Sequence, residues 1–185
     1  MQVADSPPLF EWVSYHERRL ARRFGNLMTH ACSSPPMGLH HITWRATASA
    51  VANVEVVAQA MAWLIGDVDD VELDQSTSYH GPELTMIKAW TSNKRLALRS
   101  FARLGEGNIR MLAEQFHERM DEQRVLHFRL SLDSVIRGQP VLAVATDAGT
   151  VKGQAKFEVY SGLSEDEQLQ RTLDEALNLA HQLEG

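Results

Sequence analysis

The chain has 185 residues, an apolar fraction of 44% and a formal net charge of −6, which is typical of one globular domain with room for an extension. Its single cysteine, Cys32, excludes an internal disulfide and a cysteine-rich zinc site. No apolar run reaches the roughly 18 residues that span a bilayer, and no signal-peptide pattern opens the chain. A soluble, cytoplasmic protein with no membrane partner is therefore expected.

The charges are unevenly distributed. Residues 83–137 contain ten of the eighteen Lys and Arg residues, whereas residues 46–82 contain six acids and neither Lys nor Arg. The sequence pI of about 5.7 argues against indiscriminate binding to duplex DNA. A basic block inside an acidic chain instead indicates a local anion site, and nucleic acid is the expected anion.

The first 38 residues differ from the rest. Two proline pairs, Pro7-Pro8 and Pro35-Pro36, bracket a candidate helix at 9–24, and the second pair should break any regular element. Residues 1–38 are expected to be an N-terminal extension, for which disorder is one alternative. Another alternative is a true start at Met37, with residues 1–36 outside the native protein. Detection of any native peptide from residues 1–36 would exclude the second alternative.

Alternation and helical periodicity divide the remainder into elements. Residues 39–162 are predicted to form one domain, and residues 163–185 a C-terminal helix packed on it or extending from it. The expected strands are 40–47, 71–77, 83–91, 125–132, 141–146 and 150–160, the last two forming a hairpin around Asp147-Ala-Gly149. The expected helices are 53–65, 94–104, 108–122 and one beginning at the Ser164-Glu-Asp-Glu167 capping box, with a short turn or helix at 133–138.

This order mixes antiparallel hairpins with helices. It predicts an α+β fold in which an antiparallel sheet has helices packed on one face. Gly66 should end the first helix, and Asn93 should cap the second. The other face of the sheet is then left to solvent or to a ligand.

Polar residues of the strands form the first candidate site. With the strand phases above, one set of side chains points away from the core: Arg45, His127, Arg129, Lys152 and Lys156, joined by Gln154 and Tyr160. Cations with hydrogen-bonding and aromatic neighbours on an open sheet can hold phosphates and stack bases. The alternative is a solvated face, as in many antiparallel sheets.

A helix provides the second candidate. Arg95, Arg99 and Arg103 are spaced four residues apart and should share one side, and Lys94 sits at the N-terminus, which favours anions. The alternative is a solvated helix face. A third candidate is the turn Tyr79-His80-Gly81-Pro82, where His80 could donate to a phosphate or base unless the motif is only a tight turn.

The sequence gives little support for metal binding, cofactor binding or catalysis. His40 and His41 are neighbours on a strand and should point to opposite faces, so no metal is expected. No phosphate loop, dinucleotide fingerprint or nucleophile elbow is present, so neither a cofactor nor catalysis is expected. Trp44, Trp63 and Trp90 fit core positions better than a ligand cage.

The order of motifs resembles a family of small archaeal RNA-binding proteins predicted to be exosome-associated subunits. The likeness covers residues 40–160: the turn at 79–84, the helix pair at 94–122 and the strand at 125–132, followed by Gly138. It implies a ribosomal-protein-like α+β fold and RNA binding without catalysis. One departure is Pro82, where the family has Asn after the glycine.

The leading hypothesis is therefore a non-catalytic RNA-binding protein in RNA processing, RNA degradation or ribosome-linked work. Its expected partners are single-stranded or structured RNA and exosome- or ribosome-associated proteins. The alternative is an adaptor subunit of a larger complex, whose basic patch meets an acidic protein without direct RNA contact.

Overall fold

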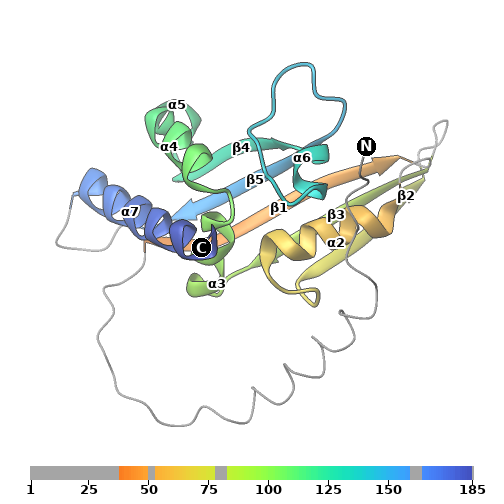
Figure 1. Ribbon diagram of the computed structural model, residues 1–185, viewed down its shortest axis with the longest axis horizontal. Coiled ribbons are helices and arrows are strands. Elements are labelled where there is room, and N and C mark those ends of the chain that lie inside the picture. The colour runs from red at the N-terminus through yellow and green to blue at the C-terminus, as the bar shows by residue number, and fades with distance from the viewer. Residues whose placement is uncertain (1–37, 50–52, 78–82, 159–163, 185) are drawn as a thin grey trace, which may run out of the picture. The chain divides into compact units, whose positions relative to one another are not determined.

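The computed structural model describes residues 38–49, 53–77, 83–158 and 164–184, all within one compact unit, Pro36–Gly185. Five strands form a fully antiparallel sheet in the order β2-β3-β1-β5-β4, with β1 at its centre (Figure 1). In chain order the strands are β1 (Leu39–Ser49), β2 (Val71–Thr77), β3 (Glu83–Thr91), β4 (Val125–Ser131) and β5 (Thr150–Phe157).

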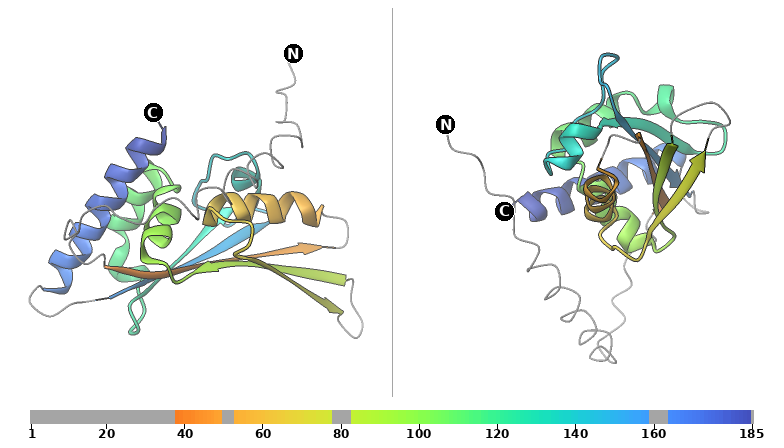
Figure 2. Two further views of the ribbon diagram at one scale, coloured as in Figure 1. Left: turned by 90° about the horizontal axis from the view of Figure 1, so that it is seen from below. Right: turned by 90° about the vertical axis from the view of Figure 1, so that its right-hand side faces the viewer.

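Six helices pack against one face of this sheet, as the edge-on view in Figure 2 shows, so the predicted α+β class is confirmed. The long C-terminal helix, α7, packs against α3 and α4. Among the described residues, no helix lies on the other face of the sheet (Figure 2). The helices are α2 (Val54–Ile65), α3 (Lys94–Ala102), α4 (Glu106–Glu114), α5 (Phe116–Arg119), α6 (Leu132–Ile136) and α7 (Glu165–Glu184).

The helix ends follow the capping signals in the sequence. The side chains of Asn53 and Asn93 each accept hydrogen bonds from two backbone N–H groups of the first turn. Gly66 ends α2 in the left-handed region at φ 93°. The capping box before α7 is formed in both directions, because Glu167 N–H donates to Ser164 Oγ at 3.3 Å and Ser164 N–H donates to Glu167 Oε2 at 3.1 Å.

The core lies between the sheet and the helices, with Trp44 of β1 fully buried at its centre. Trp44 Nε1 donates to Ser100 Oγ at 2.9 Å, and that hydroxyl donates to the Leu64 carbonyl at 2.7 Å. Gly153 of β5 lies opposite both Trp44 and Phe128. A Cβ on Gly153 would lie 2.5 Å from the Phe128 ring and 2.7 Å from the Trp44 ring, so the two rings occupy the space of the missing side chain.

The predicted hairpin of strands 141–146 and 150–160 is wrong. β5 already pairs with β1 on one side and β4 on the other, so no edge is left for a hairpin partner. The chain around Leu142 instead runs beside β4: Ser131 N–H donates to the Val141 carbonyl at 2.9 Å, and Ala143 N–H donates to the Arg129 carbonyl at 2.8 Å. Leu142 forms an isolated bridge with Leu130, and the chain then turns away.

The predicted helix 108–122 is also revised. It begins two residues earlier, at Glu106, and breaks at Gln115 into α4 and the short α5. The break allows Phe116 to enter the core at 3% exposure. Met120 then leaves the helical conformation and bridges to Leu126, which starts the return into β4.

Candidate nucleic-acid interface

Four cations form a line across the open face of the sheet. The strand register places Arg129 opposite Lys152, Lys152 opposite Arg45, and Arg45 opposite Lys88. We call these four side chains the cation row. Because neighbouring strands lie about 4.8 Å apart, the row spans roughly 14 Å.

Like charges directly opposite each other on a sheet are destabilising. Arg45 is flanked by a cation on each side, Lys88 on β3 and Lys152 on β5. Within the described part of the chain, the one ion pair of the cation row is at its edge, where Lys88 Nζ lies 3.2 Å from Glu72 Oε2. The centre of the row therefore has no protein counterion among these residues and favours an external anion.

A hollow of about 310 Å³ overlies the β4 end of the cation row. It contains three members of the row together with Arg119 from α5, and no carboxylate belongs to its lining. A neighbouring hollow of about 320 Å³ shares Arg129 and continues along the chain that runs beside β4. The residues that line the first hollow are Arg45, Arg119, His127, Phe128, Arg129, Leu142, Ala143, Lys152, Gly153 and Gln154.

A second line of side chains runs beside the cation row on the same face. His127 lies opposite Gln154, Gln154 opposite Thr43, and Thr43 opposite Trp90. We call these four side chains the neutral row. His127, Gln154 and Trp90 offer an imidazole, an amide and an indole, whereas Thr43 is only 9% exposed and its hydroxyl is largely covered.

His127 is held by hydrogen bonds at both ring nitrogens. Nε2 lies 2.8 Å from Asp121 Oδ2, and Nδ1 lies 3.3 Å from Gln154 Nε2. Since the carboxylate accepts and the amide nitrogen donates, these contacts assign the proton of neutral His127 to Nε2. The hydrogen bond from His127, followed by those from the backbone N–H groups of Val125 and Gln123, lowers the pKa of Asp121.

Trp90 is exposed, contrary to the prediction that it belongs to the core. Its side chain is 41% exposed on the open face, and Trp63 on α2 is likewise 38% exposed; Trp44 alone of the three is buried. Trp90 Nε1 donates to Glu72 Oε1 at 3.3 Å, and Lys88 Nζ lies 5.5 Å from the centre of the indole ring. Hydrogen bonds from Lys88 and then from Trp90 lower the pKa of Glu72.

The structure separates the candidate residues into groups. Arg45, Arg129, Lys152 and His127 meet on the open face. Lys156 lies on the same strand as Lys152, but its Nζ donates to the Gln123 carbonyl in the turn before β4. His80 and Tyr160 lie outside the described residues.

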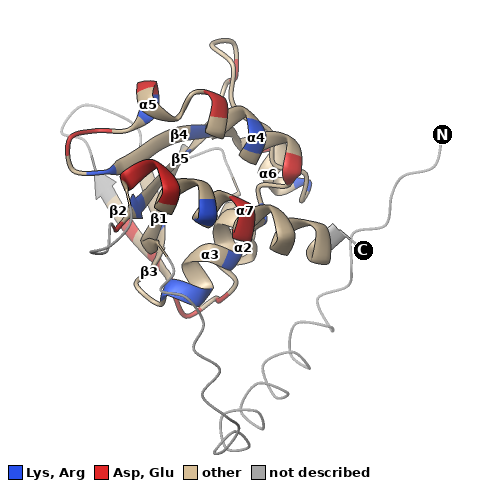
Figure 3. Cartoon of the chain, turned by 90° about the vertical axis from the view of Figure 1, so that its left-hand side faces the viewer, with Lys and Arg blue, Asp and Glu red and all other residues tan. Residues whose placement is uncertain are grey.

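The helix candidates lie on the other side of the sheet, in the layer that contains α3, and Figure 3 shows basic residues on this helix in blue. Arg95 and Arg99 are exposed there. Lys94 Nζ is bonded to Glu158 Oε2 at 2.7 Å, and Arg103 Nη1 donates to the Leu64 carbonyl at 3.3 Å near the end of α2. Lys94 and Arg103 thus each contact another part of the protein. The cation row and the cations of α3 lie on opposite sides of the sheet.

The expected geometry of the histidine pair is wrong. A β-bulge lies between Leu39 and His41, because Leu39 pairs with Phe157 while His41 pairs with Lys156. The extra residue brings the two imidazoles together, with His40 Nδ1 and His41 Nδ1 2.9 Å apart. Burial, and then the neighbouring His40 and Lys156, lower the pKa of His41. Among the described residues, no cluster of three His, Cys, Asp or Glu side chains could hold a metal ion.

Three residues of the face were missed from the sequence: Lys88, Arg119 and Trp90. Lys88 and Trp90 alternate with the buried Ile87 and Ala89 on β3, so strand phase could have placed both on the open face. Arg119 gave no such signal, because its position depends on the break between α4 and α5.

Comparison with known proteins identifies the family of the chain. A family model described as RNA binding matches residues 41–157, which include all four residues of the cation row. The chain belongs to this RNA-binding family. The family membership confirms the RNA-binding resemblance seen in the sequence and implies RNA as the ligand class. No curated protein is significantly similar to the chain.

Solved structures of archaeal proteins share the fold. A DUF54 family protein from Archaeoglobus fulgidus matches with a TM-score of 0.57 and 16% identity, covering 76% of this chain and 99% of that one. A DUF54 protein from Methanothermobacter thermautotrophicus matches with a TM-score of 0.54 and 18% identity, covering 77% and 98%. At these identities the likeness supports the fold alone.

Within the described residues, no helix is long and apolar enough to cross a membrane.

Proposed function

We propose that this protein binds RNA through the open face of its sheet, with backbone phosphates held by the cation row. The observation that carries the proposal is the alignment of four cations on adjacent strands, three of them without a carboxylate partner among the described residues. Such an arrangement costs stability unless an anion neutralises it. RNA supplies anions at regular intervals, and family membership supports RNA over other polyanions.

We further propose that binding is not coupled to catalysis. His127 is the general acid–base candidate within the hollow, and both its ring nitrogens are engaged, by Asp121 and by Gln154. We also propose that the protein acts in RNA processing, RNA degradation or ribosome-linked work, including association with an exosome. The support for that role is the resemblance of the motifs at 79–84 and 125–132 to the archaeal exosome-associated family.

A salt titration tests the RNA-binding proposal. We expect the logarithm of the association constant for RNA to fall linearly with the logarithm of salt concentration, with a slope of about −2 to −3 for three or four phosphate contacts on a single strand. Fluorescence anisotropy with a labelled RNA between 50 and 300 mM salt (roughly the range over which screening acts) measures it. Absence of salt-dependent binding would contradict the proposal and favour the adaptor subunit that meets an acidic protein.

A further inference from the structure

The cation row and the neutral row differ in chemistry and lie side by side. On one strand, side chains that share a face are two residues and roughly 6.7 Å apart, so each cation has a neutral-row neighbour at that distance. The neighbouring pairs along the strands are Arg129 with His127, Lys152 with Gln154, Arg45 with Thr43, and Lys88 with Trp90.

We propose that the occupant of this face is single-stranded RNA, lying across the strands with its phosphates along the cation row and its bases over the neutral row, one of them stacked on Trp90. This inference rests on the proposed function and names the form of the RNA and its direction. Bases of a strand are attached beside its phosphates, so two parallel rows of different chemistry match the two sides of a single strand.

The opposite flank of the cation row fits bases less well. There Thr47 lies opposite Met86, and Met86 opposite Asp74, which ends that flank with a carboxylate. The neutral row ends with the indole of Trp90, and the carboxylate beside that ring, Glu72, already accepts hydrogen bonds from Trp90 and Lys88. The difference in chemistry points the bases toward Trp90.

Trp90 has the features of a stacking platform. The residue is 41% exposed, and the hydrogen bond from Nε1 to Glu72 fixes the orientation of its ring before any ligand binds. Lys88 Nζ lies 5.5 Å from the ring centre, so a phosphate at Lys88 would bring its own base to the indole. Stacking on an aromatic side chain accepts any base, because each base has a π-face.

A duplex would use only part of this surface. In double-stranded RNA the bases are paired and stacked inside the helix and cannot reach an aromatic ring on a sheet. A duplex would use the cation row and leave Trp90 without a role. The contribution of Trp90 to RNA affinity therefore distinguishes single-stranded from double-stranded RNA as the ligand.

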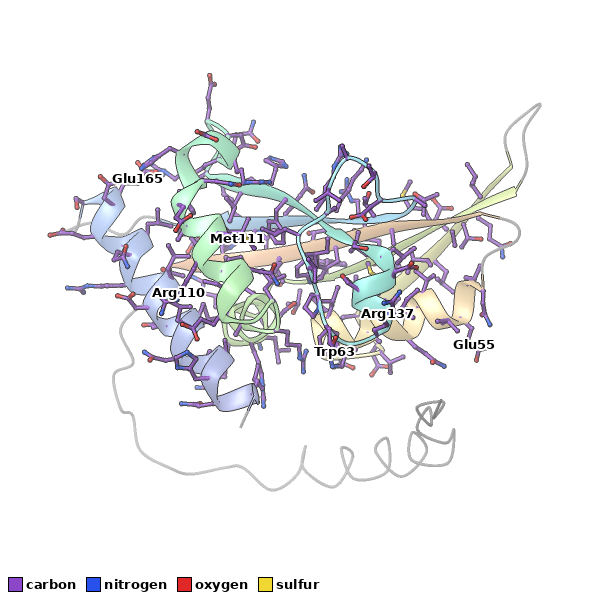
Figure 4. The ribbon with its side chains drawn as sticks, turned by 45° about the horizontal axis from the view of Figure 1, so that its top comes forward. Glu55, Trp63, Arg110, Met111, Arg137 and Glu165 are labelled. Atoms are coloured by element: carbon purple, nitrogen blue, oxygen red, sulfur yellow. The ribbon has the colours of Figure 1, made fainter. Side chains whose placement is uncertain are left out.

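The experiment compares three ten-nucleotide probes: a single-stranded uridine oligonucleotide, the same strand with abasic positions throughout, and an RNA duplex of the same length. The variants are Trp90→Ala, Trp90→Phe and a matched control, Trp63→Ala. Trp63 is exposed to a similar extent but lies on α2, on the helix side of the sheet (Figure 4).

Trp90→Ala is expected to weaken binding of the uridine strand about 5- to 150-fold and to leave binding of the abasic strand unchanged. Trp90→Phe should restore most of the affinity, and Trp63→Ala should bind all probes like the wild type. Equal losses for the uridine and abasic strands, or no loss for either, would overturn the inference. Wild-type binding to the duplex as tight as to the uridine strand would overturn it while leaving RNA binding intact, whereas binding to none of the probes would refute the proposed function itself.

Discussion

Replacing Arg45 and Arg129 together by glutamate is expected to weaken RNA binding by about 100-fold or more at 0.1 M salt. Each substitution removes a charge-assisted contact to phosphate, worth about 1.5 kcal/mol, and two such losses correspond to about 100-fold in affinity. The introduced carboxylates would also repel phosphate, and Arg45 stands at the centre of the cation row. Fluorescence anisotropy with a labelled single-stranded RNA measures the change.

The chain offers a matched control in Arg95→Glu combined with Arg99→Glu. This pair makes the same change in net charge, and both residues are exposed on α3, in the helix layer. Charges in the helix layer lie on the other side of the sheet and are weakened by salt screening, so we expect a loss below about threefold. If the α3 pair weakened binding more than the sheet pair did, α3 would be the RNA surface and the assignment to the open face would be wrong.

The second large effect is on stability. Gly153→Ala is expected to lower the free energy of unfolding by about 1–3 kcal/mol, because an added Cβ overpacks the core. The new methyl group would meet the rings of Phe128 and Trp44 at 2.5 and 2.7 Å. Those rings pack edge to face with centres 5.4 Å apart, and Trp44 is also anchored to Ser100, so neither can retreat easily. Urea denaturation followed by circular dichroism measures the loss.

Gly107→Ala makes the same chemical change in an open position. Nothing lies within 4 Å of a Cβ at Gly107, which is in the first turn of α4. Alanine there should leave stability unchanged or raise it by up to about 1 kcal/mol, since it has the higher helix propensity. Equal stability of Gly153→Ala and the wild type would show that the rings over β5 can move apart.

Local patterns in the sequence predicted much of the fold. Alternation on β1 and β4 placed Arg45, His127 and Arg129 opposite the apolar residues of the same strands, because side-chain direction on a strand has a period of two. Asn53, Gly66 and Asn93 predicted helix ends, because caps act within one turn of the chain.

Features that depend on distant partners were not predicted. The prediction of a strand at 141–146 was wrong because β5 pairs with β1 and β4, which leaves no free edge of β5 for a local hairpin. The bulge at His40 and the exposure of Trp90 depend on register and on which face the helices cover. The sequence placed cations on a sheet face, but only the register β4-β5-β1-β3 shows that four of them form one line.

We expect the cation row to lower the stability of the free protein and to be neutralised by bound RNA. Measuring RNA affinity and the free energy of unfolding of Arg45→Gln, with Arg45→Lys as the control that keeps the charge, tests it most directly. Removing the central charge relieves two like-charge pairs, each unfavourable by about 0.2–1 kcal/mol, so Arg45→Gln should bind RNA more weakly and be at least as stable as the wild type. A variant that is less stable and binds RNA as tightly as the wild type would contradict the claim.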